Sequence, residues 1–217
     1  MAVVEEATPG RRGHYPRGGV EFSRVANLSD ALFAIAMTVL VLRIESPVAG
    51  GDALAAAVVA QWPQLLAFAI SFAVIAHFWW VHHSFVAMLG ELEPGLVALT
   101  LVLLGAVALV PWPTSLIGID PTARAAVVPY LALVAIIAVL HMLLLLRAWR
   151  VDAWSERPPP GAFRWSVLSW GSSALVTFVA IAVALWMPVA GIATLLLTWP
   201  VESLVGHLAP ETCRPWV

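Results

Sequence analysis

The sequence predicts an all-α membrane protein with six membrane-spanning helices. Of its 217 residues, 61% are hydrophobic and 11% are charged. Soluble globular domains are about 45–50% apolar and about 25% charged, and a helix needs about 20 mostly apolar residues to cross a bilayer core. Six segments satisfy that requirement: residues 27–45, 63–83, 95–113, 127–147, 165–187 and 189–207.

The first segment has a short apolar run and could be mistaken for a signal peptide. Its apolar run, residues 32–42, follows several arginines, as in a signal sequence. The run ends in Arg43-Ile-Glu45-Ser-Pro47, which is a poor small-residue cleavage site. We therefore interpret it as a retained first span.

Prolines mark irregularities in the later spans. Pro111 and Pro113 are expected to loosen the end of the third span, and Pro200 to kink the sixth, because an interior proline removes a backbone donor. The turn Met187-Pro-Val189 makes the fifth and sixth spans a tight hairpin. We expect residues 1–22 to be a disordered cytoplasmic segment, 23–208 the six-helix transmembrane domain and 209–217 a cytoplasmic tail.

The arginines predict the orientation. Nine lie on one side of the predicted spans, whereas the opposite side has only Arg43 and Arg124. The positive-inside rule therefore places both termini in the cytoplasm. The nine are Arg11, Arg12, Arg17, Arg24, Arg147, Arg150, Arg157, Arg164 and Arg214.

Composition excludes several other classes. The net charge of −2 gives no basic surface for nucleic acid. The single cysteine, Cys213, cannot form an intrachain disulfide and lies in the predicted tail. No Cys/His spacing resembles a structural zinc site, and we expect neither a metal nor a cofactor.

The first span has two different faces. At about 100° per residue, Ala31, Ile35, Thr38, Val39 and Leu42 share one stripe about 100° wide. Such a stripe is also typical of ordinary helix or lipid contact. Asp30 lies about 140° from Ile35, where it could either cap the helix or pair with Arg24 or a histidine of the second span.

The second span contains the histidines. His77 lies near mid-depth and is either an ordinary buried histidine, a polar anchor to the first helix or a proton-sensitive site. Trp79 and Trp80 could be interfacial anchors or packing residues. His82 lies five residues after His77, which is a poor spacing for a metal site. We interpret the isolated polar residues His141, Glu202 and His207 as structural.

These residues resemble the bacterial, single-repeat branch of the transmembrane protein 175 family of potassium channels. Arg24-x-x-x-Leu28-Ser29-Asp30 resembles the family signature Arg-x-x-x-Phe-Ser-Asp, with Leu for Phe, and residues 31–42 resemble its first helix. Ser71-Phe72, Trp79-x-x-His82-His83 and Phe85 resemble its second helix, and Pro111-Trp-Pro113-Thr114 resembles the end of its third. The last three spans match in number and general character only.

The resemblance implies a homotetramer in which the first helix lines a central potassium pathway. It assigns the isoleucine constriction to Ile35, the pore threonine to Thr38 and a further aliphatic ring to Leu42, with Val39 beside them. Arg24, Ser29, Asp30, His77, Trp79 and His82 would support the pore helix. The expected partners are other copies of the chain, the lipid bilayer and permeant potassium ions. The expected location is a bacterial plasma membrane.

Three other functions remain open from the residues alone. A proton-coupled secondary transporter would use Asp30 and His77 as a proton relay, although no inverted repeat is visible. A membrane enzyme would use His77, His82 and His83. A non-conducting scaffold would need none of these residues.

Overall fold

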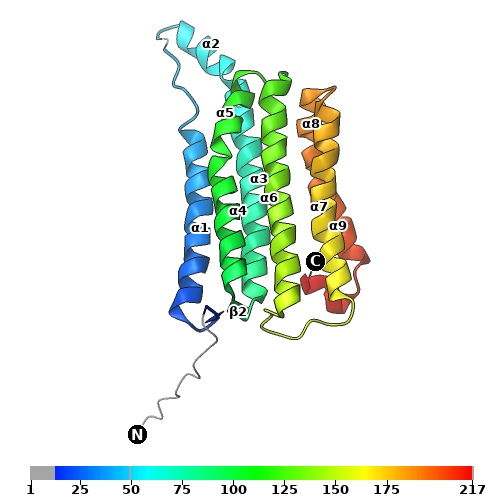
Figure 1. The fold of residues 1–217 in the computed structure, drawn as a ribbon. Helices are drawn as coiled ribbons and strands as arrows, with labels where there is room; N and C mark the ends of the chain where they lie inside the picture. The colour runs from blue at the N-terminus through cyan, green and yellow to red at the C-terminus, as the bar shows by residue number, and fades with distance from the viewer. Residues whose placement is uncertain (1–12, 49, 217) are drawn as a thin grey trace.

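The computed structural model describes residues 13–48 and 50–216. Six helical spans form one bundle, with α1 at one edge and α7 to α9 at the other (Figure 1). The predicted number of spans is therefore confirmed. The spans are α1 (Val20–Val41), α2 and α3 (Ala53–Ala60, Trp62–Met88), α4 and α5 (Pro94–Leu109, Pro111–Ile119), α6 (Arg124–Val151), α7 (Ala162–Ala184), and α8 and α9 (Pro188–Thr194, Thr198–Leu208).

The first span begins earlier than its apolar run. α1 starts at Val20, and its exposed first turns contain an ion pair between Glu21 and Arg24, with Nη1 2.9 Å from Oε1. Such i,i+3 pairs stabilise exposed helical turns. Ser29 and Asp30 consequently lie in mid-helix, so the interpretation of either as a cap is wrong.

The expected disorder of residues 1–22 is wrong for residues 13–22, and residues 1–12 lie outside the described part. β1 (Tyr15–Pro16) pairs antiparallel with β2 (Glu91–Leu92), and the Arg17 amide donates to the Gly90 carbonyl at 2.8 Å. This small sheet anchors the start of α1 to the turn between α3 and α4.

Prolines divide the third and sixth spans without ending them. Pro111 is the first residue of α5, which continues the span to Ile119, beyond the predicted end at residue 113. In the sixth span the break is the 3-10 turn η1 (Leu195–Leu197), between α8 and α9. Pro200 clashes with the carbonyl four residues earlier, and that carbonyl belongs to Leu196 within η1. The predicted kink therefore precedes the proline by about one turn.

α6 is the most buried span and holds the bundle together. It packs against α4 and α5 on one side and α7 on the other. Tyr130, Leu131 and Leu144 on it are fully buried. Because lipid tails are as apolar as leucine, its stability in a bilayer depends on the quality of packing.

Close approach of backbones forms the hairpin of α7 and α8. A Cβ added to Gly191 would lie 2.8 Å from both the Ala180 carbonyl oxygen and the Ala184 Cα. Small residues at such positions are typical of packed membrane helices. The predicted hairpin around Met187-Pro188 is thus present, with Met187 preceding α8.

An ion pair joins the two halves of the bundle at the end that carries the termini. Glu93 caps α4 by accepting from the amides of Gly95 and Leu96, and Arg147 of α6 donates to its Oε1 at 2.5 Å. The Arg147 hydrogen bond, opposed by burial and assisted by the two amides, lowers the pKa of Glu93. The pair remains charged at neutral pH.

The predicted tail is part of the folded unit. Residues Glu211–Trp216 form the 3-10 helix η2, which packs against α7. Cys213 is buried there, and the Ser166 hydroxyl donates to the Trp216 carbonyl at 2.6 Å. The sequence did not predict this helix, because Cys213 and Trp216 alone, among polar residues and prolines, show no periodic apolar pattern.

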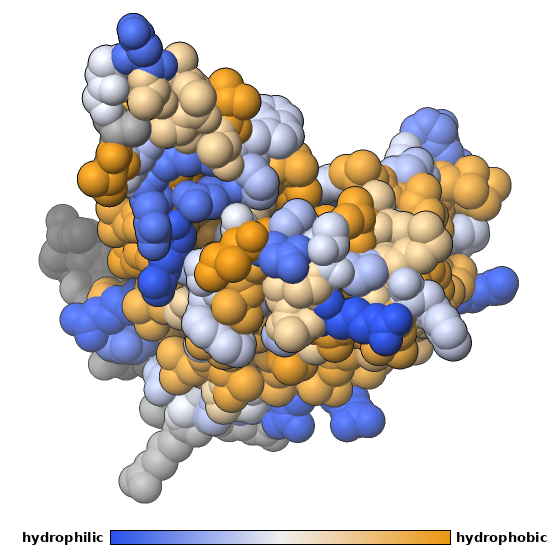
Figure 2. Space-filling model, turned by 90° about the horizontal axis from the view of Figure 1, so that it is seen from above, coloured by the Kyte–Doolittle hydropathy of each residue, from blue (hydrophilic) through white to orange (hydrophobic). Residues whose placement is uncertain are grey.

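Both termini of the described chain lie at the same end of the bundle (Figure 1). Arg43 and Arg124 lie at the opposite end, just after α1 and at the start of α6. Seen from above that end, hydrophilic side chains gather in a hollow (Figure 2), and Arg43, Glu45 and Gln64 line a cavity there. The described arginines thus have the asymmetric distribution that the sequence indicates.

Candidate functional site: the exposed face of the first helix

α1 is covered by its own chain on one face only. Phe33, Ala36 and Leu40 are buried against the bundle, whereas Ile35 and Leu42 are 60% and 78% exposed. The buried face packs on α3 and α4, which leaves α1 at the edge of the subunit (Figure 1). The division of this helix into two faces, predicted from angles alone, is present in the structure.

The exposed stripe is longer than the predicted one and slightly displaced. Ala31, Ile35, Thr38 and Leu42 are all exposed, and Leu28 extends the stripe by one turn at 46% exposure. Val39 is only half-buried. Leu28, which stands where the family signature has phenylalanine, therefore adds an aliphatic surface facing out of the subunit.

Thr38 is the hydroxyl on this stripe. Its Oγ1 donates to the Ile35 carbonyl at 2.9 Å, within the helix. A hydroxyl has one proton and two acceptor lone pairs. Because the proton is used internally, the oxygen presents its lone pairs outward and can act as an acceptor for a cation.

The face of α1 beside the stripe is held by α3. The Trp79 indole Nε1 donates to Asp30 Oδ1 at 2.9 Å, and His83 Nδ1 lies 3.8 Å from the same oxygen. Trp79 and His83 are four residues apart, so both side chains project from one face of α3. Asp30 is thus paired with the second span, which the sequence offered as one possibility. Its hydrogen-bond partner is the Trp79 indole and not Arg24.

Two further supporting residues lie in this interface. Ser29 is buried, and its hydroxyl donates to the Val25 carbonyl at 3.0 Å. His82 is buried against Phe33 of α1, with ring centroids 5.7 Å apart. Within the described part of the chain, neither ring nitrogen of His82 has a hydrogen-bond partner. His82 therefore contacts the first helix as an aromatic packing residue.

Comparisons with known proteins identify the family of this chain. The family model for the endosomal/lysosomal potassium channel TMEM175 matches residues 24–111, from the signature arginine to the start of α5. A potassium channel of Chamaesiphon minutus is 33% identical over 143 residues, which are 63% of this chain and 68% of that protein. The chain belongs to the TMEM175 family.

A second relative and a solved structure extend the match. A potassium channel of Streptomyces collinus is 41% identical over 99 residues, so the match spans about half of each protein, 45% of this chain and 48% of the relative. The crystal structure of a lysosomal potassium-selective channel TMEM175 homolog from Chamaesiphon minutus has 25% identity and a TM-score of 0.71. That match covers 85% of this chain and 98% of the other, so the shared fold extends beyond residues 24–111.

Arg24 and His77, which were predicted to support the first helix, do not join α1 to α3 through polar contacts. Arg24 pairs with Glu21 of its own helix and its side chain is 70% exposed. His77 Nε2 lies 3.4 Å from Glu202 Oε1 of α9, so the expectation that His77 anchors α1 is wrong. The cause is helix geometry, because His77 lies two residues before Trp79 and projects from another face of α3.

Other residues of the TMEM175 resemblance meet in the core. Thr114 Oγ1 of α5 lies 2.8 Å from Ser71 Oγ of α3, and the Ser71 hydroxyl donates to the Tyr130 hydroxyl of α6 at 3.3 Å. All three side chains are buried. Ser71 and Thr114 belong to the family motifs, but the sequence does not indicate that they are in contact. Nothing in the sequence around Tyr130 indicates that it joins them.

The alternative sites lack the required geometry. Among the described residues, no group of three or more His, Cys, Asp or Glu side chains could hold a metal ion. Asp30 meets Trp79 and His83, whereas His77 meets Glu202 on the other side of α3. A direct proton relay between Asp30 and His77 is therefore not formed.

Proposed function

We propose that this chain is a subunit of a potassium channel in which α1 lines a central pore formed between identical copies. The observation that carries the proposal is the exposed stripe of Leu28, Ala31, Ile35, Thr38 and Leu42 at the edge of the subunit. Both relatives are potassium channels and the solved homolog is a potassium-selective channel, which supports potassium as the ion.

One stripe at the edge of one subunit cannot enclose a pathway, so the channel requires several copies around an axis. Closed cyclic symmetry is the usual arrangement of identical subunits. The family resemblance favours four copies. Each copy would then contribute one Ile35, one Thr38 and one Leu42 to successive rings.

The side chains of the stripe have different roles in the proposed pore. A ring of Ile35 side chains narrows the pore, and an apolar constriction can gate by excluding water. Thr38 offers oxygen lone pairs to a partly dehydrated cation one turn away, because its proton is bonded to the Ile35 carbonyl. Leu42, with Val39 beside it, continues the narrow region toward the end of the helix.

The polar residues beside the stripe serve as positioning residues. Trp79 and His83 fix Asp30, while Phe33 and His82 pack between α1 and α3. These contacts set the rotation of α1 about its own axis, which decides whether Ile35 faces the pathway. No cofactor and no catalytic residue are part of the proposal.

The arginine distribution supports a bacterial plasma-membrane location with both termini in the cytoplasm. Seven of the nine arginines predicted to be cytoplasmic, namely all but Arg11 and Arg12, lie within the described residues. Arginine and lysine are enriched in cytoplasmic loops near the membrane. The hollow lined by Arg43, Glu45 and Gln64 would then face the outside.

The test is potassium and sodium flux into liposomes containing the purified protein. Ile35→Asn replaces the constriction with a wettable side chain, so we expect ion flux to rise about tenfold and the preference for potassium to fall, with about 1.4 kcal/mol corresponding to each factor of ten. The matched control is Ile136→Asn, because Ile136 of α6 is also exposed, at 51%. We expect its flux to remain that of the wild type.

The proposal fails if Ile35→Asn and wild type have the same flux and ion preference while both proteins are reconstituted to the same level. It also fails if Ile136→Asn raises the flux as much as Ile35→Asn, because a nonspecific leak would explain both. Saturating flux coupled to protons, without unitary currents, would favour a transporter instead.

A further inference from the structure

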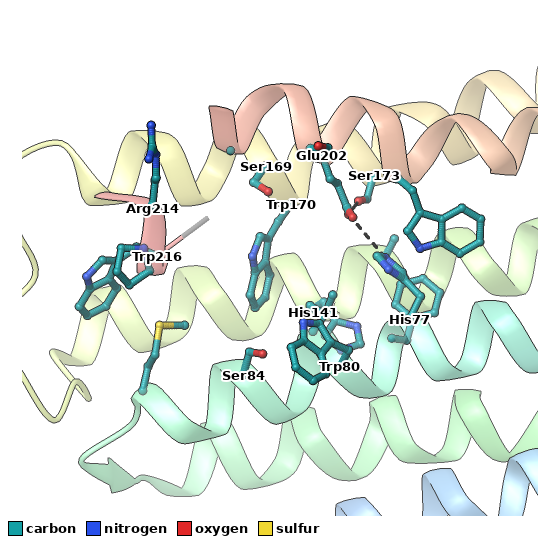
Figure 3. A pocket seen from close by; sticks show the side chains of 18 residues that line it. His77, Trp80, Ser84, His141, Ser169, Trp170, Ser173, Glu202, Arg214 and Trp216 are labelled. Atoms are coloured by element: carbon teal, nitrogen blue, oxygen red, sulfur yellow. Dashed lines mark hydrogen bonds and ion pairs between the residues drawn. The ribbon is translucent and has the colours of Figure 1, made fainter. Parts of the chain in front are cut away.

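The far edge of the subunit contains a cavity that the pore does not use. It has a volume of about 550 Å³ and lies among α3, α6, α7, α9 and η2 (Figure 3). Cavities that bind small molecules measure about 300–1,000 Å³ and combine apolar walls with a few polar groups. This cavity has the size and lining of a ligand site.

Aromatic rings from four different elements form its walls. Trp80 comes from α3, Trp170 from α7, Trp199 from α9 and Trp216 from η2. An aromatic ring presents a negative face, so a cation placed over it is attracted electrostatically. Indole is the strongest of the aromatic side chains in this respect. The walls favour an apolar ligand that carries a positive charge.

A carboxylate lies among these rings. Glu202 of α9 accepts a hydrogen bond from Ser173 at Oε1, and His77 Nε2 lies 3.4 Å from the same oxygen. Figure 3 shows Glu202 between the two, pointing toward α3. Both contacts use Oε1, so Oε2 can accept from a ligand. Ionisable groups at membrane depth are costly and usually functional.

A second acceptor in the cavity wall lacks a donor. His141 Nδ1 lies 3.0 Å from the Ile137 carbonyl, which can only accept, so the proton of the neutral ring is on Nδ1. Nε2 is then an acceptor. It is buried and has no partner among the described residues. Nε2 has almost no surface open to the cavity, so Glu202 Oε2 is the acceptor for a ligand with N–H or O–H donors.

The charges around the cavity favour Glu202 as the position for a positive charge. Arg214 lies at the opposite end of the cavity from Glu202 (Figure 3), and its charge is balanced by Glu211, with Nη1 3.8 Å from Oε1. Glu202 lies among the aromatic rings, where it can pair with a ligand cation. A metal ion fits poorly, because no group of three metal-ligating residues exists in the described part of the chain.

We propose that this cavity binds a small organic cation, a protonated primary amine on an apolar body. Its ammonium group donates to Glu202 Oε2, while its apolar body lies against Trp80 and Trp170. This binding is independent of the proposed pore, because α1 is at the other edge of the subunit (Figure 1).

The experiment uses phenethylammonium as the probe and measures binding to the full chain in detergent by calorimetry and tryptophan fluorescence. Phenethyl alcohol, which has the same body without the charge, is the ligand control. We expect the wild type to bind phenethylammonium at least tenfold more tightly than phenethyl alcohol. Glu202→Gln should abolish that preference, whereas Glu156→Gln, which changes an exposed carboxylate outside the cavity, should retain it.

A second pair of variants tests the aromatic wall without touching the carboxylate. Trp80→Leu should weaken phenethylammonium binding about threefold to tenfold, and Trp112→Leu, at another exposed tryptophan, should not change it. Ile35→Asn should bind like the wild type. The proposal is overturned if the alcohol binds as well as the ammonium, if Glu156→Gln matches Glu202→Gln, or if neither probe binds. A protein without potassium flux that still binds the ammonium would refute only the proposed pore.

Discussion

The two edges of the subunit use the same helix in opposite ways. On the α1 edge, α3 presents Trp79 and His83, which pair with Asp30. On the α9 edge, the same helix presents His77 and Trp80 to an open cavity. At the first edge Asp30 is paired within the protein and His82 is enclosed by packing, whereas at the second edge Glu202 uses only Oε1 for its contacts and lines an open cavity. The difference separates a contact that positions a helix from a site that can receive a ligand.

The largest effect is expected at the buried face of α1. Phe33 is fully buried between α1 and α3, and its ring is tilted against that of His82, with centroids 5.7 Å apart. Phe33→Ala should reduce the free energy of unfolding by about 3–5 kcal/mol, since the cavity left behind cannot collapse. The measurement is chemical unfolding in detergent, followed by fluorescence.

Phe178→Ala is the matched control, because Phe178 of α7 is 52% exposed. Its free energy of unfolding should remain within about 0.5 kcal/mol of the wild type. If both variants lose the same free energy of unfolding, the packed face of α1 is not what holds this helix. The two edges would then not differ in this respect.

A smaller effect is expected at the hairpin of the other edge. Gly191→Ala places a Cβ against the backbone of α7 at Ala180 and Ala184, so the two helices must separate. The overpacking should cost about 1–3 kcal/mol. Thermal unfolding of the purified protein in detergent measures it.

Gly105→Ala in α4 is the comparison, since nothing lies within 4 Å of its added Cβ. Alanine is favoured over glycine inside a helix by about 1 kcal/mol, so this variant should be as stable as the wild type or more so. A stabilised Gly191→Ala would show that α7 and α8 are less tightly packed than the α1 edge, reversing the comparison.

The sequence predicted much more of the first edge than of the second. The stripe containing Ile35 and Thr38 follows from a 3.6-residue period, and the signature from Arg24 to Asp30 fixes its register. The Glu202–His77 pair could not be predicted, because the two residues are 125 positions apart and each looks like an isolated polar group in an apolar helix. Periodicity shows which residues share a face, but not which face of another helix they meet.

The ends of the helices were harder to predict than their number. Residues 21–30, which mix polar and apolar side chains, continue α1, where Glu21 pairs with Arg24 and Asp30 pairs with Trp79. Hydrophobicity alone therefore placed the start of the span seven residues late, at residue 27 instead of Val20. η2 was missed because its stability comes from burial of Cys213 and contact with α7, neither of which is periodic.

The smallest effect is expected where the two edges are joined, at the Glu93–Arg147 pair. Glu93→Gln removes the charge but keeps the shape, and it should cost about 1 kcal/mol at pH 7, because the Arg147 side chain is 42% exposed and water screens the attraction. The folded pKa of Glu93 lies below its ordinary value of 4.5. The contribution of the pair is therefore complete above pH 4.5 and is lost as the pH falls through the lowered folded pKa.

The measurement is thermal unfolding of wild type and Glu93→Gln at pH 7 and at successively lower pH, down to about pH 3. The difference in stability should narrow only below pH 4.5, since the wild-type carboxylate then takes up its proton. Glu156→Gln, at an exposed position, should follow the wild type throughout. A difference that stays constant down to the acid end would mean that the glutamine disrupts the cap of α4 rather than the charge pair. Glu93 would then stabilise the protein by capping α4 and not by its ion pair with Arg147.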